Sequence, residues 1–122
     1  MTIEAELYGA TYELRTGLQS DIPNKEMDMF VTINVDKNGN IYEIFVRAES
    51  KEYFEALNLV TRLVSMALRA AVDPMTIAKE LQEVYSMTSQ HIIPGTTDLC
   101  PSIIARIGLI LEHEINRLKI RR

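Results

Sequence analysis

The alternation of apolar and polar residues predicts strands in the first half of the chain. Residues 7–15 alternate with a period of two, which is typical of a half-buried strand, and residues 28–36 and 41–48 do the same. The turn at residues 36–40 (DKNGN) contains Asn-Gly, which supplies the positive φ angles of a tight hairpin. Residues 18–27 are a polar connection. The pattern therefore predicts an antiparallel sheet of at least three strands.

The same alternation predicts which side chains of these strands face the core. One face is expected to carry Ala10, Tyr12, Leu14, Met29, Val31, Ile33, Val35, Tyr42, Ile44 and Val46. The opposite face then carries polar residues together with Phe30 and Phe45. A sheet with one apolar face must be covered by another layer.

Helical spacing of apolar residues predicts that this layer comes from the second half of the chain. Residues 51–71 form a long helix, a second runs from Pro74 to about Tyr85 after an Asp73 cap, and Pro101 opens a third. The expected core positions of the first and third are Phe54, Leu57, Val60, Thr61, Val64, Leu68, Ala71, Ile104, Ile107, Leu111, Ile115 and Leu118. Residues 86–99 form a connecting loop. We therefore expect one α+β domain over residues 1–122, in which a sheet of three or more strands packs in two layers against about three helices.

Composition and charge limit the classes of function that the chain can have. With 122 residues, 47% of them hydrophobic, the chain suits a single core. A net charge of −4 disfavours binding to a nucleic-acid polymer. The single cysteine and two histidines provide neither an internal disulfide nor a zinc ligand set, so no metal and no cofactor are expected. The absence of a signal-like start or a long apolar run predicts a cytoplasmic protein without a membrane span, in the host cytoplasm if a phage encodes it.

Catalytic motifs are scarce. The chain has no glycine-rich phosphate loop, HExxH, GxSxG or paired-cysteine motif. Cys100 is a nucleophile in principle, with His91 or His113 as its base, but a buried structural cysteine is the alternative that we favour. Glu112 and Glu114 are expected to be solvated. The sequence therefore predicts a binding protein and not an enzyme.

Two rows of polar side chains recur at helical spacing. The first comprises Asn58, Arg62, Ser65 and Arg69, and the second Ser102, Arg106, His113 and Arg117. Arginine presents a planar fork of donors that suits phosphate oxygens, so such rows are candidate sites for an anionic ligand. The alternative is that both are simply the solvated backs of amphipathic helices.

The loop before the third helix adds a further candidate. Residues 93–98 (IPGTTD) offer backbone amides and two hydroxyls just ahead of a helix N-terminus, where phosphate groups are attracted. Tyr85 is placed to stack on a base, although a position at the edge of the core is an equal interpretation.

Three stretches carry a family resemblance. FVTINVDKNGNIYEIFV (30–46), ALNLVTRLVSMALRAAVDPMTIAKEL (56–81) and LCPSIIARI (99–107) resemble the TSCPD domain, and YGATYELRTG (8–17) fits as well. That domain occurs at the C-terminus of cobalamin-dependent ribonucleotide reductases and as small free-standing proteins. Residues 98–102 (DLCPS) keep only Cys-Pro of the motif that gives the family its name. The cysteine pair and the large barrel of such reductases are missing from this chain.

In outline the chain is also similar to the Thoeris anti-defence proteins of phages. This resemblance implies an oligomeric, non-enzymatic sponge that sequesters a cyclic ADP-ribose-type or cyclic oligonucleotide signal. The implied partner is a phosphate-bearing, nucleotide-like small molecule. With the two arginines of the first row added, the candidate ligand-binding residues are Tyr85, Thr96, Arg106, His113, Arg117, Arg62 and Arg69. The alternative functions are an accessory module of a ribonucleotide reductase and, third, a nucleotide hydrolase. The wide apolar surface of the helix at 51–71 predicts a homo-oligomer.

Overall fold

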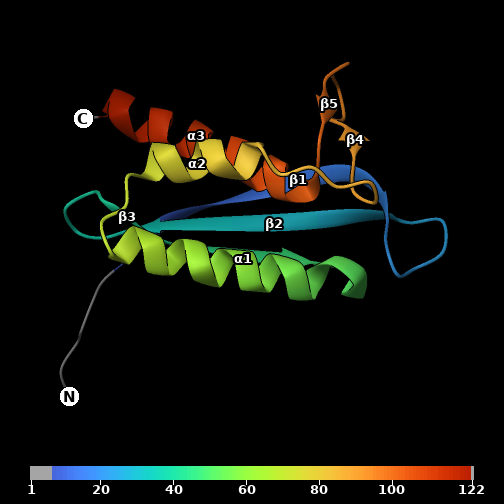
Figure 1. Ribbon diagram of the computed structural model, residues 1–122, viewed down its shortest axis with the longest axis horizontal. Helices are drawn as coiled ribbons and strands as arrows, with labels where there is room; N and C mark the ends of the chain where they lie inside the picture. The colour runs from blue at the N-terminus through green and yellow to red at the C-terminus, as the bar shows by residue number, and fades with distance from the viewer. Residues whose placement is uncertain (1–6, 122) are drawn as a thin grey trace.

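The computed structural model describes residues 7–121 and confirms the α+β fold. The element order is β1 (Tyr8–Gln19), β2 (Glu26–Val35), β3 (Ile41–Ala48), α1 (Lys51–Arg69), α2 (Pro74–Gln82), β4 (His91–Ile92), β5 (Leu99–Cys100) and α3 (Ile103–Arg121). The first three strands form an antiparallel sheet in sequence order, and β4 and β5 pair separately (Figure 1). The predicted domain over residues 1–122 extends at both ends beyond the described residues.

The first strand is longer than its alternation predicted. It pairs in register from Tyr8 opposite Val35 to Arg15 opposite Asp28, and the register then shifts before Gln19. The Thr16 hydroxyl donates a 2.7 Å hydrogen bond to the carbonyl of Met27, which keeps the strands together through the shift. The polar connection therefore shortens to residues 20–25.

A second irregularity changes which face Tyr42 takes. Val35 pairs with Ile41 whereas Asn34 pairs with Glu43, so Tyr42 is the extra residue of a bulge. Ile41 and Ile44 are both buried, and Tyr42 is only partly covered. The expectation that Tyr42 belongs to the buried face is wrong, because a bulge breaks the period of two.

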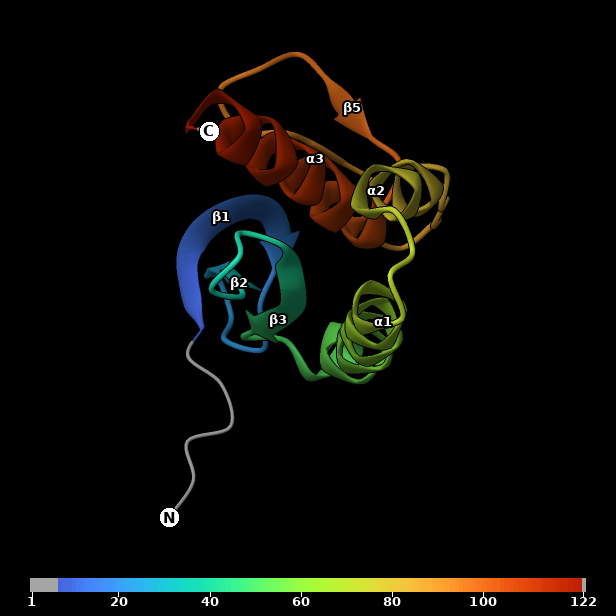
Figure 2. The ribbon, with the colours of Figure 1, turned by 90° about the vertical axis from the view of Figure 1, so that its left-hand side faces the viewer.

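The helices cover one face of the sheet in two groups. Helix α1 packs along β3, while α3 lies over β2 and α2 packs against α3. Viewed from one end of the molecule, α2 and α3 lie together above the curled sheet, and α1 lies below α2, next to β3 (Figure 2). The core joins both groups and includes Val31, Ile33, Leu57, Val64, Leu68, Ile107 and Leu111.

Two features of the predicted helices differ from expectation. Phe54 is 48% exposed, so it is not a core residue, and α1 ends at Arg69. Ala71, which has a positive φ of 65°, is therefore an exposed residue of the α1–α2 connection. The predicted Asp73 cap is confirmed, because its carboxylate accepts a 3.1 Å hydrogen bond from the amide of Thr76.

The region before α3 is more ordered than a loop. Residues 86–99 include β4, and β5 begins at their end; the two strands form a short hairpin that projects from the body of the molecule (Figure 1). Helix α3 begins at Ile103, two residues after Pro101. The Ser102 hydroxyl accepts the amide of Ala105, and the Ser89 hydroxyl accepts the amide of Ile103. These side chains occupy two amides of the helix N-terminus where a phosphate was expected to bind.

Candidate functional site: a groove between α1 and the edge of β3

A groove of about 240 Å³ runs between α1 and β3, the edge strand of the three-stranded sheet. Its lining includes every member of the first predicted polar row. The lining residues are Glu43, Ile44, Phe45, Asn58, Thr61, Arg62, Ser65, Met66 and Arg69. The structure therefore brings Arg62 and Arg69 together in one concave site, as the helical spacing of the first polar row predicted.

Ser65 fixes the distance between the two walls of the groove. Its hydroxyl accepts a 3.1 Å hydrogen bond from the amide of Ile44 and lies 3.2 Å from the carbonyl of the same residue, to which it donates. The helix thereby satisfies backbone groups of the edge strand that no neighbouring strand pairs. Ser65 is buried, so it is part of the floor and is not a ligand contact.

The two arginines of the groove are available to a ligand. Arg62 and Arg69 are exposed, and within residues 7–121 neither forms an ion pair. The guanidinium carbon of Arg69 lies 5.5 Å from the ring centre of Tyr42, so the ring orients the charge without neutralising it. Glu43 also lines the groove, where its carboxylate accepts a 2.9 Å hydrogen bond from the side-chain amide of Asn34.

Phe45 is a groove residue that the polar-row argument missed. It is 53% exposed and lies on the face of the sheet that no described helix covers. An exposed phenylalanine beside two arginines gives the groove a ring on which a flat heterocycle can stack. The sequence carried the signal, because Phe45 sits on the polar side of a clearly alternating strand.

The second polar row, on α3, is divided between two structural interactions. Arg117 pairs with Glu114, whose carboxylate also accepts a 2.9 Å hydrogen bond from the Tyr12 hydroxyl. His113 is exposed and meets the ring of Tyr12 edge-on, with centres 5.6 Å apart. Glu114 is only 1% exposed, so the expectation that it is solvated is wrong.

Glu114 is buried because it has strong partners. Burial alone would raise the pKa of its carboxyl group, but hydrogen bonds from Arg117 and Tyr12 outweigh burial and hold that pKa below its ordinary value. The pKa of Tyr12 is raised, first by its own burial and then by the Glu114 carboxylate. These three side chains fasten α3 to β1, and Arg117 is occupied in doing so.

Arg106 is buried at the base of the projecting hairpin. Its Nη1 donates a 3.0 Å hydrogen bond to Nε2 of His91, whose Nδ1 donates a 2.9 Å bond to the carbonyl of Ser89. Cys100 lies opposite His91 in the hairpin and is also buried. Burial raises the pKa of the Cys100 thiol, which disfavours the reactive thiolate. The alternative reading of a buried cysteine is confirmed, and the three side chains attach the hairpin to α3.

The arrangement around His91 predicts that acid weakens the protein. Burial, and next the positive charge of Arg106, lower the pKa of His91 below its ordinary 6.5, while the bond to Ser89 opposes the shift. The unfolded chain therefore binds a proton at His91 more readily than the folded chain does. As a result, the free energy of unfolding decreases as the pH falls below about 6.5. We expect the urea midpoint to drop between pH 7.5 and 5.5 for the wild type and to change much less for His91→Gln. If the urea midpoint of His91→Gln depended on pH as steeply as that of the wild type, this assignment would be contradicted.

The other predicted site residues lie apart from the groove. Tyr85 is 65% exposed after α2, and is not at the edge of the core. Thr96 is at the tip of the hairpin, where its hydroxyl donates to the carbonyl of Ile93 and accepts the amide of Asp98. Neither residue lines the groove, and their roles as ligand contacts stay predictions.

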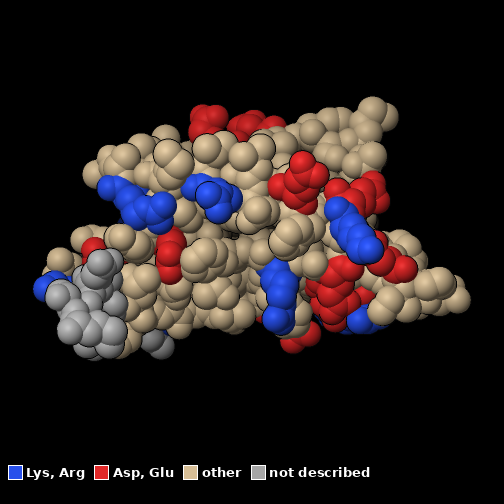
Figure 3. Space-filling view, turned by 90° about the horizontal axis from the view of Figure 1, so that it is seen from below, with Lys and Arg blue, Asp and Glu red and all other residues tan. Residues whose placement is uncertain are grey.

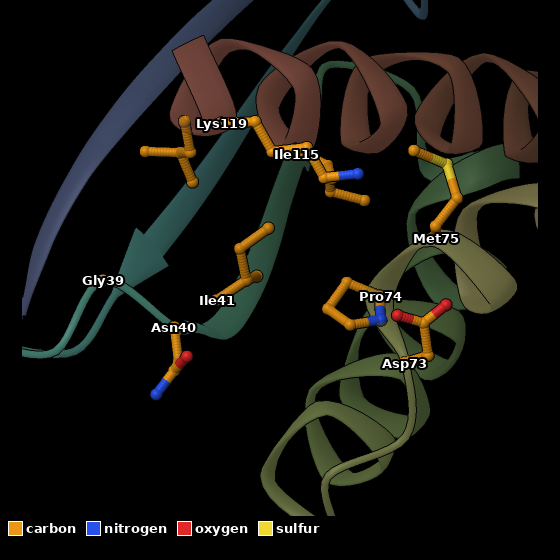
Figure 4. A pocket seen from close by; sticks show the side chains of 9 residues that line it. Gly39, Asn40, Ile41, Asp73, Pro74, Met75, Ile115 and Lys119 are labelled. Carbon is orange, nitrogen blue, oxygen red and sulfur yellow. The ribbon is translucent and has the colours of Figure 1, made fainter. Parts of the chain in front are cut away.

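A second hollow, of about 210 Å³, lies where the β2–β3 turn, the start of α2 and the end of α3 meet (Figure 4). Ile41, Met75 and Ile115 contribute to its wall, and Lys119 and Asp73 are the charged residues among the described ones that line it. One ammonium group, in a hollow that also holds a carboxylate, is a weaker attraction for phosphate than two guanidiniums that form no ion pair among the described residues. We therefore take the groove between α1 and β3 as the candidate site.

A sequence comparison places the chain in a family. Residues 8–115 match the TSCPD domain, so the chain belongs to the TSCPD domain family. No curated protein and no solved structure matches the chain. The described residues contain no group of three or more His, Cys, Asp or Glu side chains placed to hold a metal ion. Within residues 7–121, no helix has the length and hydrophobicity needed to cross a membrane.

Proposed function

We propose that this TSCPD-domain protein is a non-catalytic binding protein that holds a small, phosphate-bearing, nucleotide-like molecule in the groove between α1 and β3. The observation that carries the proposal is the pair Arg62 and Arg69, two guanidiniums in one concave site without an ion pair among the described residues. Each can form charge-assisted, bidentate bonds with phosphate oxygens. Phe45 and Asn58, on the same walls, can stack on and hydrogen-bond to a base.

The size of the groove limits how the ligand sits. Its volume of about 240 Å³ is below the roughly 300–1,000 Å³ of pockets that enclose a drug-sized ligand. A nucleotide would therefore place its phosphates between the arginines and leave part of its body at the surface. Tight retention then requires further contacts from outside this groove, as in an oligomer.

In the finer form of the proposal, the protein is a sponge that sequesters a cyclic ADP-ribose-type or cyclic oligonucleotide immune signal. The support for this form is the outline similarity to Thoeris anti-defence proteins and the absence of catalytic motifs from the sequence. None of the comparisons adds to it. A sponge binds its signal tightly and returns it chemically intact.

The decisive experiment is a thermal-shift screen followed by calorimetric titration. The panel comprises cyclic ADP-ribose isomers, cyclic di- and trinucleotides, ATP and dATP. A ligand at about 100 times its dissociation constant should stabilise the protein by about 2.7 kcal/mol. Chromatography of ligand released by heating separates binding from turnover, because an intact ligand supports the sponge and a converted ligand contradicts it.

Matched variants test the groove itself. We expect Arg62→Gln and Arg69→Gln each to weaken binding about 10- to 100-fold, because each removes a charge-assisted hydrogen bond of about 1.5–3 kcal/mol. Arg15→Gln is the control, since Arg15 is an exposed arginine of β1 that pairs with Glu26. Unchanged affinity in both groove variants would contradict the site. If only Arg106→Ala or Arg117→Ala lowered the affinity for the ligand, with the fold intact, the binding site would lie on α3 instead.

Family membership favours a second candidate function. The TSCPD domain is known as a module of ribonucleotide reductases, so an accessory or regulatory module that acts on such an enzyme is the alternative. The projecting hairpin carries exposed Ile92 and Leu99 side by side and offers an apolar contact for a protein partner. Stabilisation by ATP or dATP alone, together with co-purification with the reductase, would favour this function over the sponge.

A further inference from the structure

The outer side of α1 carries a row of apolar residues that faces away from the core. The row comprises Ala56, Leu59, Leu63 and Met66 of the helix and Ala70, the residue that directly follows it, with alternating spacings of three and four residues. Leu59, Leu63 and Met66 are 58%, 56% and 60% exposed. Core residues Leu57, Thr61, Val64 and Leu68 occupy the opposite side of the helix. We call the outer row the α1 seam.

The spacing of the α1 seam is that of a helix–helix interface. Apolar residues that repeat every 3.5 positions form the contact line of two packed helices. A regular apolar row of this kind is not expected on a helix face that stays in contact with water. Within residues 7–121 no segment covers the seam. In a monomer, residues 7–121 therefore leave three large apolar side chains of one helix face uncovered.

Charges along α1 indicate what covers the seam. Glu52 and Glu55 lie near its start, and Arg62 and Arg69 lie in its second half. In Figure 3 most acidic side chains of this face gather toward the right-hand end, where α1 begins, whereas basic side chains occur toward both ends of the face. Glu55, Arg62 and Arg69 are spaced by seven residues, so all three border the same side of the seam.

We propose that the α1 seam binds the α1 seam of a second copy of the chain, with the two helices antiparallel about a two-fold axis. In this pairing Leu59 of one copy lies against Leu63 of the other, and the same contact repeats by symmetry. Glu55 of one copy then faces Arg69 of the other. A parallel pairing would place the charged border against the uncharged Val60 and Ala67 side, so it gains no such ion pair.

Some features oppose the pairing and others favour it. The two Arg62 side chains lie near the axis and repel, and Glu43, which lines the same groove, offsets this charge in part. Because Arg62, Met66 and Arg69 belong to the groove, the pairing brings two grooves next to each other at one interface. In the pair Arg69 faces Glu55 of the other copy, so Arg62 is the groove arginine that keeps its charge free for a ligand. The test of the pairing contains no nucleotide.

The first test is the molecular mass in solution. We expect the wild type to sediment as a dimer and Leu63→Glu to sediment as a monomer, with dissociation at least about 100-fold easier. Met87→Glu is the control, because Met87 is an apolar side chain that is 85% exposed elsewhere. Circular dichroism checks that Leu63→Glu keeps its helices. A wild type that stays monomeric at its highest soluble concentration would overturn the proposal, and so would a folded Leu63→Glu that stays dimeric.

The second test measures the orientation of the helices. Leu59→Cys and Leu63→Cys are prepared separately, and the native Cys100 is buried and does not compete. An antiparallel pair cross-links under mild oxidation only when the two variants are mixed, because position 59 meets position 63. If each variant cross-links with itself, and mixing the two variants adds no further cross-linked product, the helices are parallel and the assignment is overturned.

Discussion

Glu114→Ala is expected to lower the free energy of unfolding by about 3 kcal/mol, since it removes the buried anion of a hydrogen-bonded pair and leaves its partners without an acceptor. Glu114 is 1% exposed and receives hydrogen bonds from Tyr12 and Arg117, which join β1 to α3. Urea denaturation at pH 7 measures the loss. Glu112→Ala is the matched control on the same helix, because Glu112 pairs with the exposed Lys79 and such surface pairs contribute only about 0–1 kcal/mol.

The same carboxylate predicts a second acid transition. Its lowered pKa means that the folded chain holds the anion more strongly than the unfolded chain, so stability is lost as the pH falls below the ordinary value of 4.5. This window lies below that of His91. In Arg117→Gln the largest opposing interaction is gone and burial raises the Glu114 pKa, so the loss of stability in acid that this carboxyl causes should shrink or reverse. Equal effects of Glu114→Ala and Glu112→Ala would show that this cluster does not hold the fold together.

Gly108→Ala is expected to destabilise the protein by about 2 kcal/mol, although alanine is the better helix former. A Cβ at position 108 would lie 2.7 Å from the carbonyl oxygen of Ala78 and 2.9 Å from Cβ of Leu81. Both contacts are on α2, and a backbone oxygen cannot move aside without shifting the helix. Overpacking costs about 1–3 kcal/mol, which outweighs the gain of up to about 1 kcal/mol in helix propensity.

Hydrogen exchange locates the effect of Gly108→Ala. We expect faster exchange of the α2 amides, because α2 contacts the rest of the fold mainly through α3. Asn116→Ala, at an exposed position of α3, is the control and should be neutral or slightly stabilising. A Gly108→Ala protein as stable as the wild type would mean that the two helices are farther apart than their close approach at this glycine indicates.

The sequence predicted the fold class because its strands and helices differ clearly in period. The hairpin turn, the Asp73 cap and the core row of α3 follow from local rules, and the structure confirms them. Tyr42 and Phe54 were misplaced. A bulge turns Tyr42 away from the core, and no described segment covers Phe54 fully near the start of α1. Both errors arise from tertiary packing, which a periodic sequence pattern does not report.

The candidate site was predictable in part. The row on α1 was a correct guide to which arginines share a surface, because helical spacing alone places Arg62 and Arg69 together. The row on α3 was not, because partners far away in sequence decide its members: His91 binds Arg106, and Glu114 with Tyr12 holds Arg117 in place. Only the fold reveals that one row is available to a ligand and the other is occupied.

The Ser65 hydroxyl that binds both backbone groups of Ile44 also restricts how the protein can assemble. An exposed edge strand is a template on which foreign strands can add, which leads to open-ended aggregation or to capture of an extended peptide. With α1 fastened across the middle of β3, a continuous ladder cannot grow from that edge. Strand addition is therefore blocked at this edge. The chain can still assemble through its helix surfaces into closed oligomers with a fixed number of subunits.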